Sequence, residues 1–262
     1  MKLLREYSQN FLQNSRYAAQ IVQALELNAE DNLIEIGAGA GILTQYIVSQ
    51  HYRRIQLIEI DPRWSELLNQ KYGNIPGVKI LSQDFLNYNF KSNWGEASKQ
   101  LKVIGNIPYN ITSQIIFKLL ENYHYISRIV LLVQKEVADR LKADPGSKEY
   151  GITTILMATK GHVKKLFDIG KENFRPVPKV DSSVILVDLD VISDDILDYE
   201  SFVRLIRGIF RKRRKKIKNS LSNIIGKDFI GQIKSIDLNA RPEQLSVDEL
   251  KLLANETYKL TN

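Results

Sequence analysis

Four short apolar runs in the chain are each followed by residues whose types fit ligand chemistry. The first run, 32–36, leads into a glycine-rich segment at 37–41 (GAGAG), and glycine lets a backbone turn sharply and approach a ligand closely. Glu59 ends the second run, and Asp84 follows the third. If these runs are neighbouring parallel strands, the glycines and both carboxylates meet at the carboxyl edge of a sheet, where such folds bind ligands.

The fourth run ends in Asn106, Ile107, Pro108 and Tyr109, which suit chemistry on an aromatic amine. The exocyclic amine of adenine is a poor nucleophile because its lone pair is delocalised into the ring. The Asn106 side-chain oxygen and the Ile107 carbonyl can hold its two hydrogens and free that lone pair, while Pro108 stiffens the turn. Tyr109 can stack on an extruded base. Phe174 lies in a loop stiffened by two prolines, and we expect it to complete an aromatic sandwich with Tyr109.

Both patterns resemble motifs of S-adenosylmethionine-dependent methyltransferases. The glycine segment begins two residues after Glu35 and lacks the third glycine of the dinucleotide fingerprint, because position 42 is isoleucine. A polar residue, a variable one, proline and an aromatic are typical of amino-group methyltransferases. In this interpretation S-adenosylmethionine is the cofactor, Glu59 accepts hydrogen bonds from its ribose hydroxyls, and Asp84 accepts one from its adenine amine.

The composition excludes several other chemistries. The 262 residues include no cysteine, which excludes disulfides, thiolate metal sites and the cysteine-dependent methylation of pyrimidine carbon 5. The three histidines are scattered, and we expect no metal. The sequence contains neither a secretory signal nor an apolar run of about 18 residues, the length that spans a membrane. We therefore expect a cytoplasmic protein with no membrane partner.

The basic excess of the chain is concentrated in one segment. The net charge is +7, and 204–218 holds nine of the 37 basic residues and none of the 30 acidic ones. The rest of the chain therefore has 28 basic and 30 acidic residues. Such a density of like charge predicts binding to a polyanion, since neutralised phosphates release counterions. We expect one amphipathic helical segment with a buried stripe of Phe202, Ile206, Ile209, Phe210, Ile217, Leu221 and Ile224. Its outer face would carry Arg204, Arg207, Arg211 and Lys215. The candidate RNA-binding residues are Arg204, Arg207, Arg211, Lys212, Arg213, Arg214, Lys215 and Lys216.

Alternating hydrophobic patterns predict an α/β fold of two domains. Strands are expected at 32–37, 55–60, 78–82, 101–106, 128–133, 162–169 and 182–189. Helices are expected at 17–27 (capped by Asn14 or Ser15), 41–50, 62–72, 112–122, 134–142 and 152–160. This alternation favours a Rossmann-like class I methyltransferase sheet, mainly parallel, with helices on both faces. We expect a catalytic domain over 1–190 and a helical domain over 191–262, in which a linker at 191–198 precedes an all-helical remainder at 199–262.

Ten segments together resemble the ribosomal RNA adenine dimethyltransferase family, and most closely its bacterial small-subunit branch. They are YSQNFL (7–12), EIGAGAG (35–41), IEID (58–61), QDFL (83–86), GNIPYNI (105–111), QKEVADRL (134–141), PGSKEYG (145–151), FRPVPKVDSSV (174–184), FRKRRKKIKNSL (210–221) and RPEQLSVDELKLLAN (241–255). By position, the resemblance implies cofactor ligands at Asn10, Leu12, Gly37, Glu59, Asp84 and Asn106. It also implies that Asn106, Ile107, Pro108, Tyr109 and Phe174 bind the target base.

The resemblance further implies an activity and a partner, and it implies that 191–262 is the rRNA-binding domain. Members of this family dimethylate the N6 amines of two adjacent adenosines in the 3′-terminal hairpin loop of 16S rRNA, within the 30S subunit. They act late in subunit assembly, and loss of the modification gives kasugamycin resistance. A monomeric enzyme is the expected state.

Three other functions compete with this interpretation. The first is a 23S rRNA adenine methyltransferase of the macrolide-resistance type, against which PGSKEYG and RPEQLS argue. The second is a non-catalytic RNA-binding assembly or transcription factor, against which Glu59, Asp84 and the tetrad at 106–109 argue. The third, a nicotinamide oxidoreductase, is disfavoured by Ile42.

Overall fold

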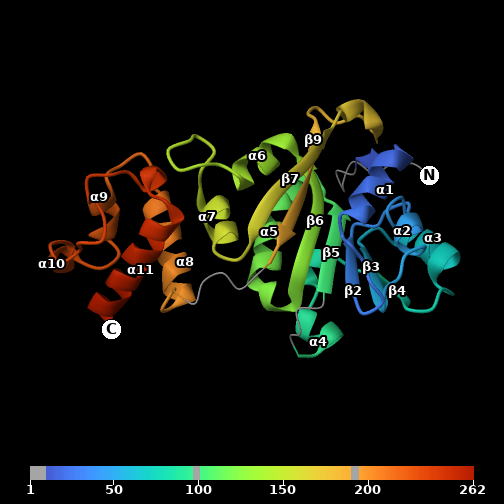
Figure 1. The fold of residues 1–262 in the computed structure, drawn as a ribbon, viewed down its shortest axis with the longest axis horizontal. Coiled ribbons are helices and arrows are strands. Elements are labelled where there is room, and N and C mark those ends of the chain that lie inside the picture. The colour runs from blue at the N-terminus through green and yellow to red at the C-terminus, as the bar shows by residue number, and fades with distance from the viewer. Residues whose placement is uncertain (1–9, 97–100, 190–194) are drawn as a thin grey trace. The chain divides into compact units, whose positions relative to one another are not determined.

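The N-terminal part of the chain is built around a seven-stranded sheet in the order β4-β3-β2-β5-β6-β9-β7 (Figure 1). The computed structural model describes residues 10–96, 101–189 and 195–262. The strands are β2 (Asn32–Ile36), β3 (Arg54–Glu59), β4 (Val78–Ser82), β5 (Leu101–Asn106), β6 (Ile126–Gln134), β7 (His162–Ile169) and β9 (Ser182–Asp188). The pairs β6–β9 and β9–β7 are antiparallel and all other neighbouring pairs are parallel, so β9 alone runs opposite to the other strands of this sheet. The expected mainly parallel sheet is confirmed.

Helices cover both faces of this sheet, as the alternating pattern predicts. One face packs against α1 (Ser15–Gln23), α2 (Thr44–Ile47) and α3 (Pro62–Tyr72). The side chain of Asn14 caps α1 by accepting the Arg16 N–H, and Asp61 caps α3 by accepting the Arg63 N–H. Alternate strand residues point to the opposite face and are equally buried, and α5 (Thr112–Glu121) contributes apolar residues there.

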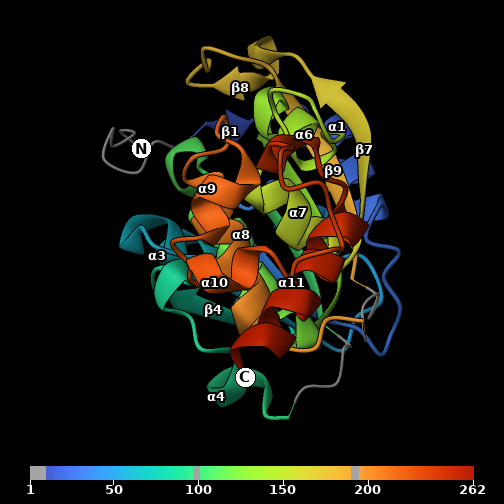
Figure 2. The same ribbon diagram turned by 90° about the vertical axis from the view of Figure 1, so that its left-hand side faces the viewer.

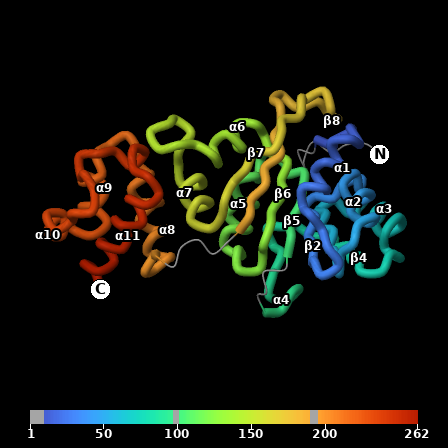
Figure 3. Tube along the Cα trace, viewed as in Figure 1, coloured from blue at the N-terminus to red at the C-terminus, as the bar shows by residue number. Residues whose placement is uncertain are grey.

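The start of the described chain is tied to the segment before β9. The short strands β1 (Phe11–Leu12) and β8 (Phe174–Arg175) form an antiparallel pair, visible in Figure 2. The Gln13 N–H donates to the Asn173 carbonyl at 2.8 Å. The trace in Figure 3 follows the segment between β7 and β9 as it extends past the sheet to reach this pair. Residues 10–13 are thereby held beside the carboxyl edge of the sheet.

The C-terminal part is helical, as expected, over the described residues of 199–262. Its helices are α8 (Tyr199–Phe210), α9 (Ile217–Leu221), α10 (Lys227–Ile230) and α11 (Val247–Thr261). Asp198 caps α8, and Ser246 forms a capping box with Glu249 at the start of α11. Phe202, Ile206 and Ile209 are fully buried, as the amphipathic pattern predicts.

Two helix predictions are wrong in extent. The expected helix over 204–218 is interrupted, because α8 ends at Phe210 and α9 begins at Ile217. The cations at 211–216 form turns instead, since six like charges in one stretch repel each other. Arg211 and Lys215 therefore do not share a helical face with Arg204. The expected helix at 41–50 is shorter as well, because the glycine turn extends to residue 43 and leaves only α2.

One residue of the expected buried stripe is exposed. Ile224, which the pattern placed among the buried positions, follows α9 and is 41% exposed. The expected stripe assumes a continuous helix, whereas α9 ends at Leu221, so helical periodicity does not hold at Ile224.

The chain divides into two compact units, and the division differs from the sequence expectation at one place. Residues 139–161, which include α7 (Ile152–Ala158), group with 195–262 rather than with the sheet. Tyr150 is buried and lies 6.3 Å from the Phe210 ring, and the Gly146 N–H donates to the Glu243 carbonyl. The division falls within α6 (Lys135–Leu141), while 191–194 of the expected linker lie outside the described residues.

Remaining short elements lie at the periphery. A short helix, α4 (Phe90–Trp94), precedes β5, and its Trp94 ring lies 4.1 Å from the Arg54 guanidinium.

Across the described ranges, no helix combines the length and the apolar character needed to cross a bilayer.

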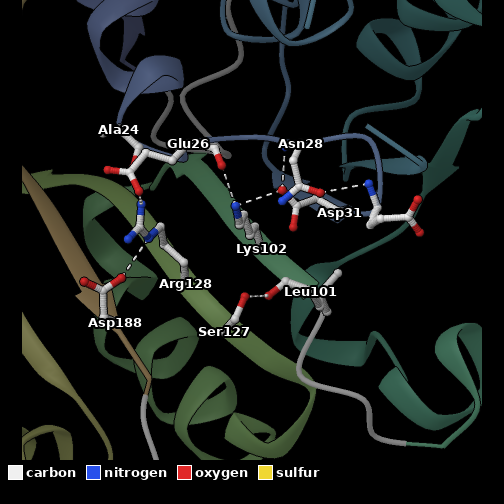
Figure 4. Close-up of polar contacts among 10 residues, drawn as sticks. Ala24, Glu26, Asn28, Asp31, Leu101, Lys102, Ser127, Arg128 and Asp188 are labelled. Carbon is white, nitrogen blue, oxygen red and sulfur yellow. Dashed lines mark hydrogen bonds and ion pairs between the residues drawn. The ribbon is translucent and has the colours of Figure 1, made fainter. Parts of the chain in front are cut away.

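A charged cluster fastens the amino-terminal edge of the sheet to the loop after α1 (Figure 4). Lys102 Nζ on β5 lies 2.8 Å from Asp31 Oδ2 and donates to the Glu26 carbonyl at 2.7 Å. Arg128 on β6 pairs with Glu26 at 2.6 Å and with Asp188 at 2.7 Å. Lys102 and Asp31 are both buried, so removal of either charge leaves the other without compensation.

We expect Lys102→Met to lower the free energy of unfolding by about 3 kcal/mol, the cost of leaving a buried carboxylate unpaired. The loss is measured by urea denaturation. The control is Lys79→Met, which changes an exposed lysine on β4 of the same sheet and should shift the midpoint little. Equal midpoints for the two variants would contradict a stabilising role of the Lys102–Asp31 pair.

Candidate functional site

A cavity of about 200 Å³ opens at the carboxyl edge of the parallel strands. Fourteen residues line it, all from the sheet-bearing unit: Asn10, Phe11, Gly37, Gly39, Glu59, Ile60, Asp84, Leu86, Asn106, Ile107, Pro108, Tyr109, Asn110 and Ile111. They come from β1 and the residue before it, from the ends of β3 and β5, and from the turns that follow β2, β3, β4 and β5. The glycine segment, the two carboxylates and the tetrad at 106–109 thus meet at one site.

The Glu59 side chain is hydrogen-bonded to the backbone of the glycine turn. Its Oε2 accepts the Gly39 N–H at 2.8 Å, and its Oε1 accepts the Asp61 N–H at 2.9 Å. Gly37 and Gly39 have φ values of 66° and 53°, a conformation that side chains other than glycine disfavour. Burial raises the pKa of Glu59, while the backbone donors oppose this shift. Each carboxylate oxygen can accept more than one hydrogen bond, so a carboxylate that lines the cavity suits ligand hydroxyls.

Phe11 covers the glycine turn and is a cavity residue that the sequence did not reveal. A Cβ at Gly39 would lie 2.6 Å from the Phe11 ring, so glycine is needed there for packing as well as for backbone conformation. The ring also packs against Trp64, with centroids 5.2 Å apart. No local pattern separates Phe11 from the neighbouring Leu12, because only the pairing of β1 with β8 sets which side chain faces the cavity.

Asp84 lies beside apolar cavity residues. Its Oδ1 accepts the Leu86 N–H at 2.8 Å, which fixes the carboxylate at the start of a short helical turn. Leu86 lines the same cavity, as does Ile60, which is 43% exposed. An acceptor next to apolar surface suits a heteroaromatic ring that carries an amine. Ile60 directly follows Glu59 in a buried strand pattern, so its exposure had no signal in the sequence.

The Asn106 side chain is oriented by the backbone of Asn10. Its Nδ2 donates to the Asn10 carbonyl at 2.7 Å, which assigns the other position of the amide to the acceptor Oδ1. The next residues are fixed as well: the Ile107 N–H donates to the Leu132 carbonyl at 3.1 Å, and Thr112 Oγ1 donates to the Pro108 carbonyl at 3.1 Å. The turn after β5 therefore presents an ordered acceptor to the cavity.

Tyr109 completes this wall of the cavity. Its Oη lies 2.6 Å from Ser182 Oγ, at the start of β9. Burial raises the pKa of Tyr109, the bond to Ser182 opposes this shift, and the phenol is neutral at physiological pH. Its ring is thereby available as an uncharged stacking surface.

Two of the expected site residues do not reach the cavity. The side chains of Leu12 and Phe174 are 1% and 0% exposed and belong to the hydrophobic core. They lie opposite each other in the β1–β8 pair. The aromatic sandwich expected between Phe174 and Tyr109 is therefore absent from this structure, and Phe174 instead supports the strand pair that carries Phe11. The other expected cofactor and target-base residues all line the cavity: Asn10, Gly37, Glu59, Asp84, Asn106, Ile107, Pro108 and Tyr109.

The candidate RNA-binding cations differ in their surroundings. Arg213 is only partly exposed: its Nε lies 2.8 Å from Glu243, and it donates to the Lys148 carbonyl at 2.9 Å. Arg204 donates to Ser201 Oγ, and Lys216 donates to Asn239. The remaining candidates are exposed: Arg207, Arg211, Lys212, Arg214 and Lys215. Arg213 thus has a structural role in the helical unit.

Within the ranges that the structure describes, no group of three or more His, Cys, Asp or Glu side chains is arranged to hold a metal ion.

Glu35 is a buried carboxyl beneath the glycine turn. Burial raises its pKa from 4.5 to about 8; the Thr44 hydroxyl, which donates at 2.7 Å, opposes this shift, and the nearby Glu59 adds to it. Because the folded state binds this proton more tightly than the unfolded chain, stability is lost as the pH rises from about 4.5 toward 8.

We therefore expect Glu35→Gln, which keeps the acceptor for Thr44 but does not ionise, to weaken the decline of unfolding free energy between pH 5 and pH 8. Urea titrations at both pH values measure the slope. Glu66→Gln, at an exposed carboxyl on α3, should leave the slope of the wild-type chain unchanged. A Glu35→Gln slope equal to that of Glu66→Gln would contradict the prediction.

Comparison with known families decides what kind of protein carries this cavity. A family model described as ribosomal RNA adenine dimethylase matches residues 1–259. The chain belongs to the ribosomal RNA adenine dimethylase family. The resemblance drawn from its motifs is thereby confirmed, and the dimethylase is a methyltransferase.

Relatives of the dimethylase match along nearly its whole length. Ribosomal RNA small subunit methyltransferase A of Chlorobium phaeobacteroides is 40% identical over 245 residues, which cover 94% of this chain and 87% of that protein. The protein of the same name from Thermotoga maritima is 38% identical over 250 residues, covering 95% and 84%.

Solved structures share the fold. A dimethyladenosine transferase from Plasmodium falciparum has a TM-score of 0.78 at 24% identity and covers 93% of this chain and 96% of that one. The 23S rRNA methyltransferase ErmE has a TM-score of 0.70 at 22% identity, covering 95% and 100%. These likenesses confirm the expected class I methyltransferase fold.

Proposed function

We propose that the dimethylase transfers methyl groups from S-adenosylmethionine to the N6 amines of two adjacent adenosines in the 3′-terminal hairpin loop of 16S rRNA. It would act on the 30S subunit late in its assembly, as a monomer in the cytoplasm. The observation that carries the proposal is the Asn106 amide, which Asn10 orients beside the Glu59 and Asp84 carboxylates in one cavity.

The cavity residues fit S-adenosylmethionine. Glu59 lines the cavity and can accept hydrogen bonds from ribose hydroxyls, and Asp84 can accept one from the adenine amine beside Ile60 and Leu86. Space above Gly37 suits close approach of a ligand, since a Cβ there would meet no atom nearer than the Asn106 carbonyl oxygen at 3.8 Å. When bound, the cofactor supplies an electrophilic methyl group on its sulfonium.

The turn at 106–109 would prepare the adenine amine for attack. Asn106 Oδ1 and the Ile107 carbonyl oxygen would accept hydrogen bonds from the two N–H groups of the amine, which favours a tetrahedral nitrogen with a freer lone pair. Tyr109 stacks on the extruded base and aligns the nitrogen with the methyl group. No strong base is required, because the methylated amine is acidic and releases its proton afterwards. Orientation and fixed acceptors supply most of the barrier lowering.

The exposed cations of the helical unit would bind the rRNA. Arg207 lies on α8, and Arg211, Lys212, Arg214 and Lys215 lie on the loop that follows it. Contacts of this kind are made to phosphates and add affinity without selecting a base sequence.

The small subunit is favoured over 23S rRNA by the names of the relatives, which are 33–40% identical to this chain. The two segments that argue against the macrolide-resistance type, PGSKEYG and RPEQLS, lie in contact: the Gly146 N–H donates to the Glu243 carbonyl. The likeness to ErmE shows the fold alone.

The deciding experiment is transfer of a radiolabelled methyl group from S-adenosylmethionine to purified 30S subunits that lack the dimethyladenosines. Mass spectrometry of the digested rRNA should reveal N6,N6-dimethyladenosine. Naked 23S rRNA serves as the competing substrate and should remain unlabelled. Labelling of 23S rRNA alone would favour the macrolide-resistance activity, and no labelling of either would refute methyl transfer.

A further inference from the structure

A buried serine fixes the tyrosine of the cavity wall. Tyr109 Oη lies 2.6 Å from Ser182 Oγ, and Ser182 is fully buried and is not among the residues that line the cavity. We propose that Ser182 is a positioning residue, which holds the Tyr109 ring in the orientation that stacks on the target base. This inference rests on the proposed function and adds a residue that the motif-based prediction did not include.

Ser182 is a rigid anchor because both sides of its strand are paired. It is the first residue of β9, where it lies opposite Gln134 of β6 and Ile169 of β7. The preceding carbonyl, that of Asp181, accepts the Lys135 N–H at 3.0 Å. A hydroxyl held in the middle of three strands cannot follow the tyrosine if the ring turns away.

The opposite end of Tyr109 is fixed by its own turn. The Pro108 carbonyl accepts the Ile111 N–H at 3.2 Å and Thr112 Oγ1 at 3.1 Å, which fixes the backbone on both sides of the tyrosine. The two side-chain torsions then remain the free variables, and the bond to Ser182 restricts both. Without this bond the partly buried hydroxyl has to turn toward water to find a partner.

The expected consequence lies in turnover rather than in cofactor binding. Glu59 and Asp84, the proposed cofactor ligands, accept hydrogen bonds from the backbone N–H groups of Gly39 and Leu86, respectively, and not from Ser182. Misorientation of the stacking ring shifts the amine away from in-line attack, which lowers kcat. Binding of rRNA through the cations of the helical unit should be unaffected, because Ser182 belongs to the other unit, so KM should change little.

The test compares Ser182→Ala with Ser183→Ala. Ser183 is the next residue, is equally buried, and donates to Asp168 Oδ1 at 2.6 Å, so its loss also removes a buried hydrogen bond from β9. Its side chain points to the opposite face of the strand and has no contact with Tyr109. We expect similar urea midpoints for the two variants, with kcat on unmethylated 30S subunits about 5- to 30-fold lower only for Ser182→Ala.

Two further variants separate positioning from general damage. Tyr109→Phe removes the same bond without changing β9, and Tyr109→Phe combined with Ser182→Ala should be no slower than Tyr109→Phe alone. Ser182→Thr keeps the hydroxyl and should restore most of kcat. The affinity for S-adenosylhomocysteine, measured by calorimetry, should match the wild type in every variant.

The outcomes are distinguishable from failure of the proposed function. A wild-type enzyme that does not label 30S subunits refutes the proposed function and this inference with it. If the wild type is active and Ser182→Ala and Ser183→Ala have equal kcat, only the positioning role is overturned. The positioning role is also overturned if the loss of kcat in the Tyr109→Phe and Ser182→Ala double variant equals the product of the two single losses. If Ser182→Ala fails to fold, Tyr109→Phe decides the question. A kcat of Tyr109→Phe equal to that of the wild-type enzyme would overturn the proposal.

Discussion

Replacing Asn106 by alanine should reduce methyl transfer by at least about 100-fold, the scale of losing one fixed hydrogen-bonding group that acts in the transition state. The variant removes the Oδ1 acceptor for the adenine amine, and with it the bond to the Asn10 carbonyl that orients the amide. Binding of rRNA should persist, because the proposed phosphate contacts lie in the helical unit. Single-turnover methyl transfer to 30S subunits and an RNA-binding titration measure the two effects.

Two companion variants locate the cause of that loss. Asn106→Asp keeps an acceptor oxygen but places a second oxygen against the Asn10 carbonyl, so we expect the carboxyl to be misoriented and the rate to be intermediate. Asn110→Ala removes an exposed amide that also lines the cavity, and its rate should fall less than about threefold. Near-normal turnover by Asn106→Ala would refute the amine-acceptor mechanism.

The sheet and the placement of its ligand residues were accessible from the sequence for a physical reason. Strands buried on both faces read as continuous apolar runs, and their carboxyl ends meet wherever the strands are parallel. The spacing therefore placed the glycine turn, Glu59, Asp84 and the tetrad at 106–109 together, and the cavity contains all of them. Helix N-caps could also be predicted from local sequence, as the Asn14 cap of α1 shows.

Features that depend on contacts distant in sequence were not accessible. Leu12 and Phe174 face the core because β1 pairs with β8, and no local pattern encodes that register. Residues 211–216 are all Arg or Lys, which are good helix formers, yet the chain turns at Arg211. The Ile217 N–H donates to the Ala240 carbonyl where α9 begins. Tertiary contacts and charge repulsion there override local propensity. The Ser182–Tyr109 bond is likewise invisible until the fold brings β9 beside the turn.

Neutralising the exposed cations after α8 should weaken rRNA binding by about 100-fold or more at 0.1 M salt. The variant changes Arg211, Lys212, Arg214 and Lys215 to glutamine, all of which are exposed. If each contacts one phosphate, the slope of log affinity against log salt should become shallower by about 3, since each contact contributes about 0.7–0.9. Titrations of 30S subunits over a range of salt concentrations measure both quantities.

Arg213 provides the matched control within the same loop. Its guanidinium is bound to Glu243 and to the Lys148 carbonyl, so Arg213→Gln should lower the stability of the helical unit and change the salt slope little. The quadruple variant should show the reverse: unchanged stability and a shallower salt slope. The methyl transfer rate at saturating 30S subunits should also persist in the quadruple variant, because none of the four residues lines the cavity. An unchanged slope would mean that these cations do not contact phosphates, and that the charge density of this loop serves another purpose.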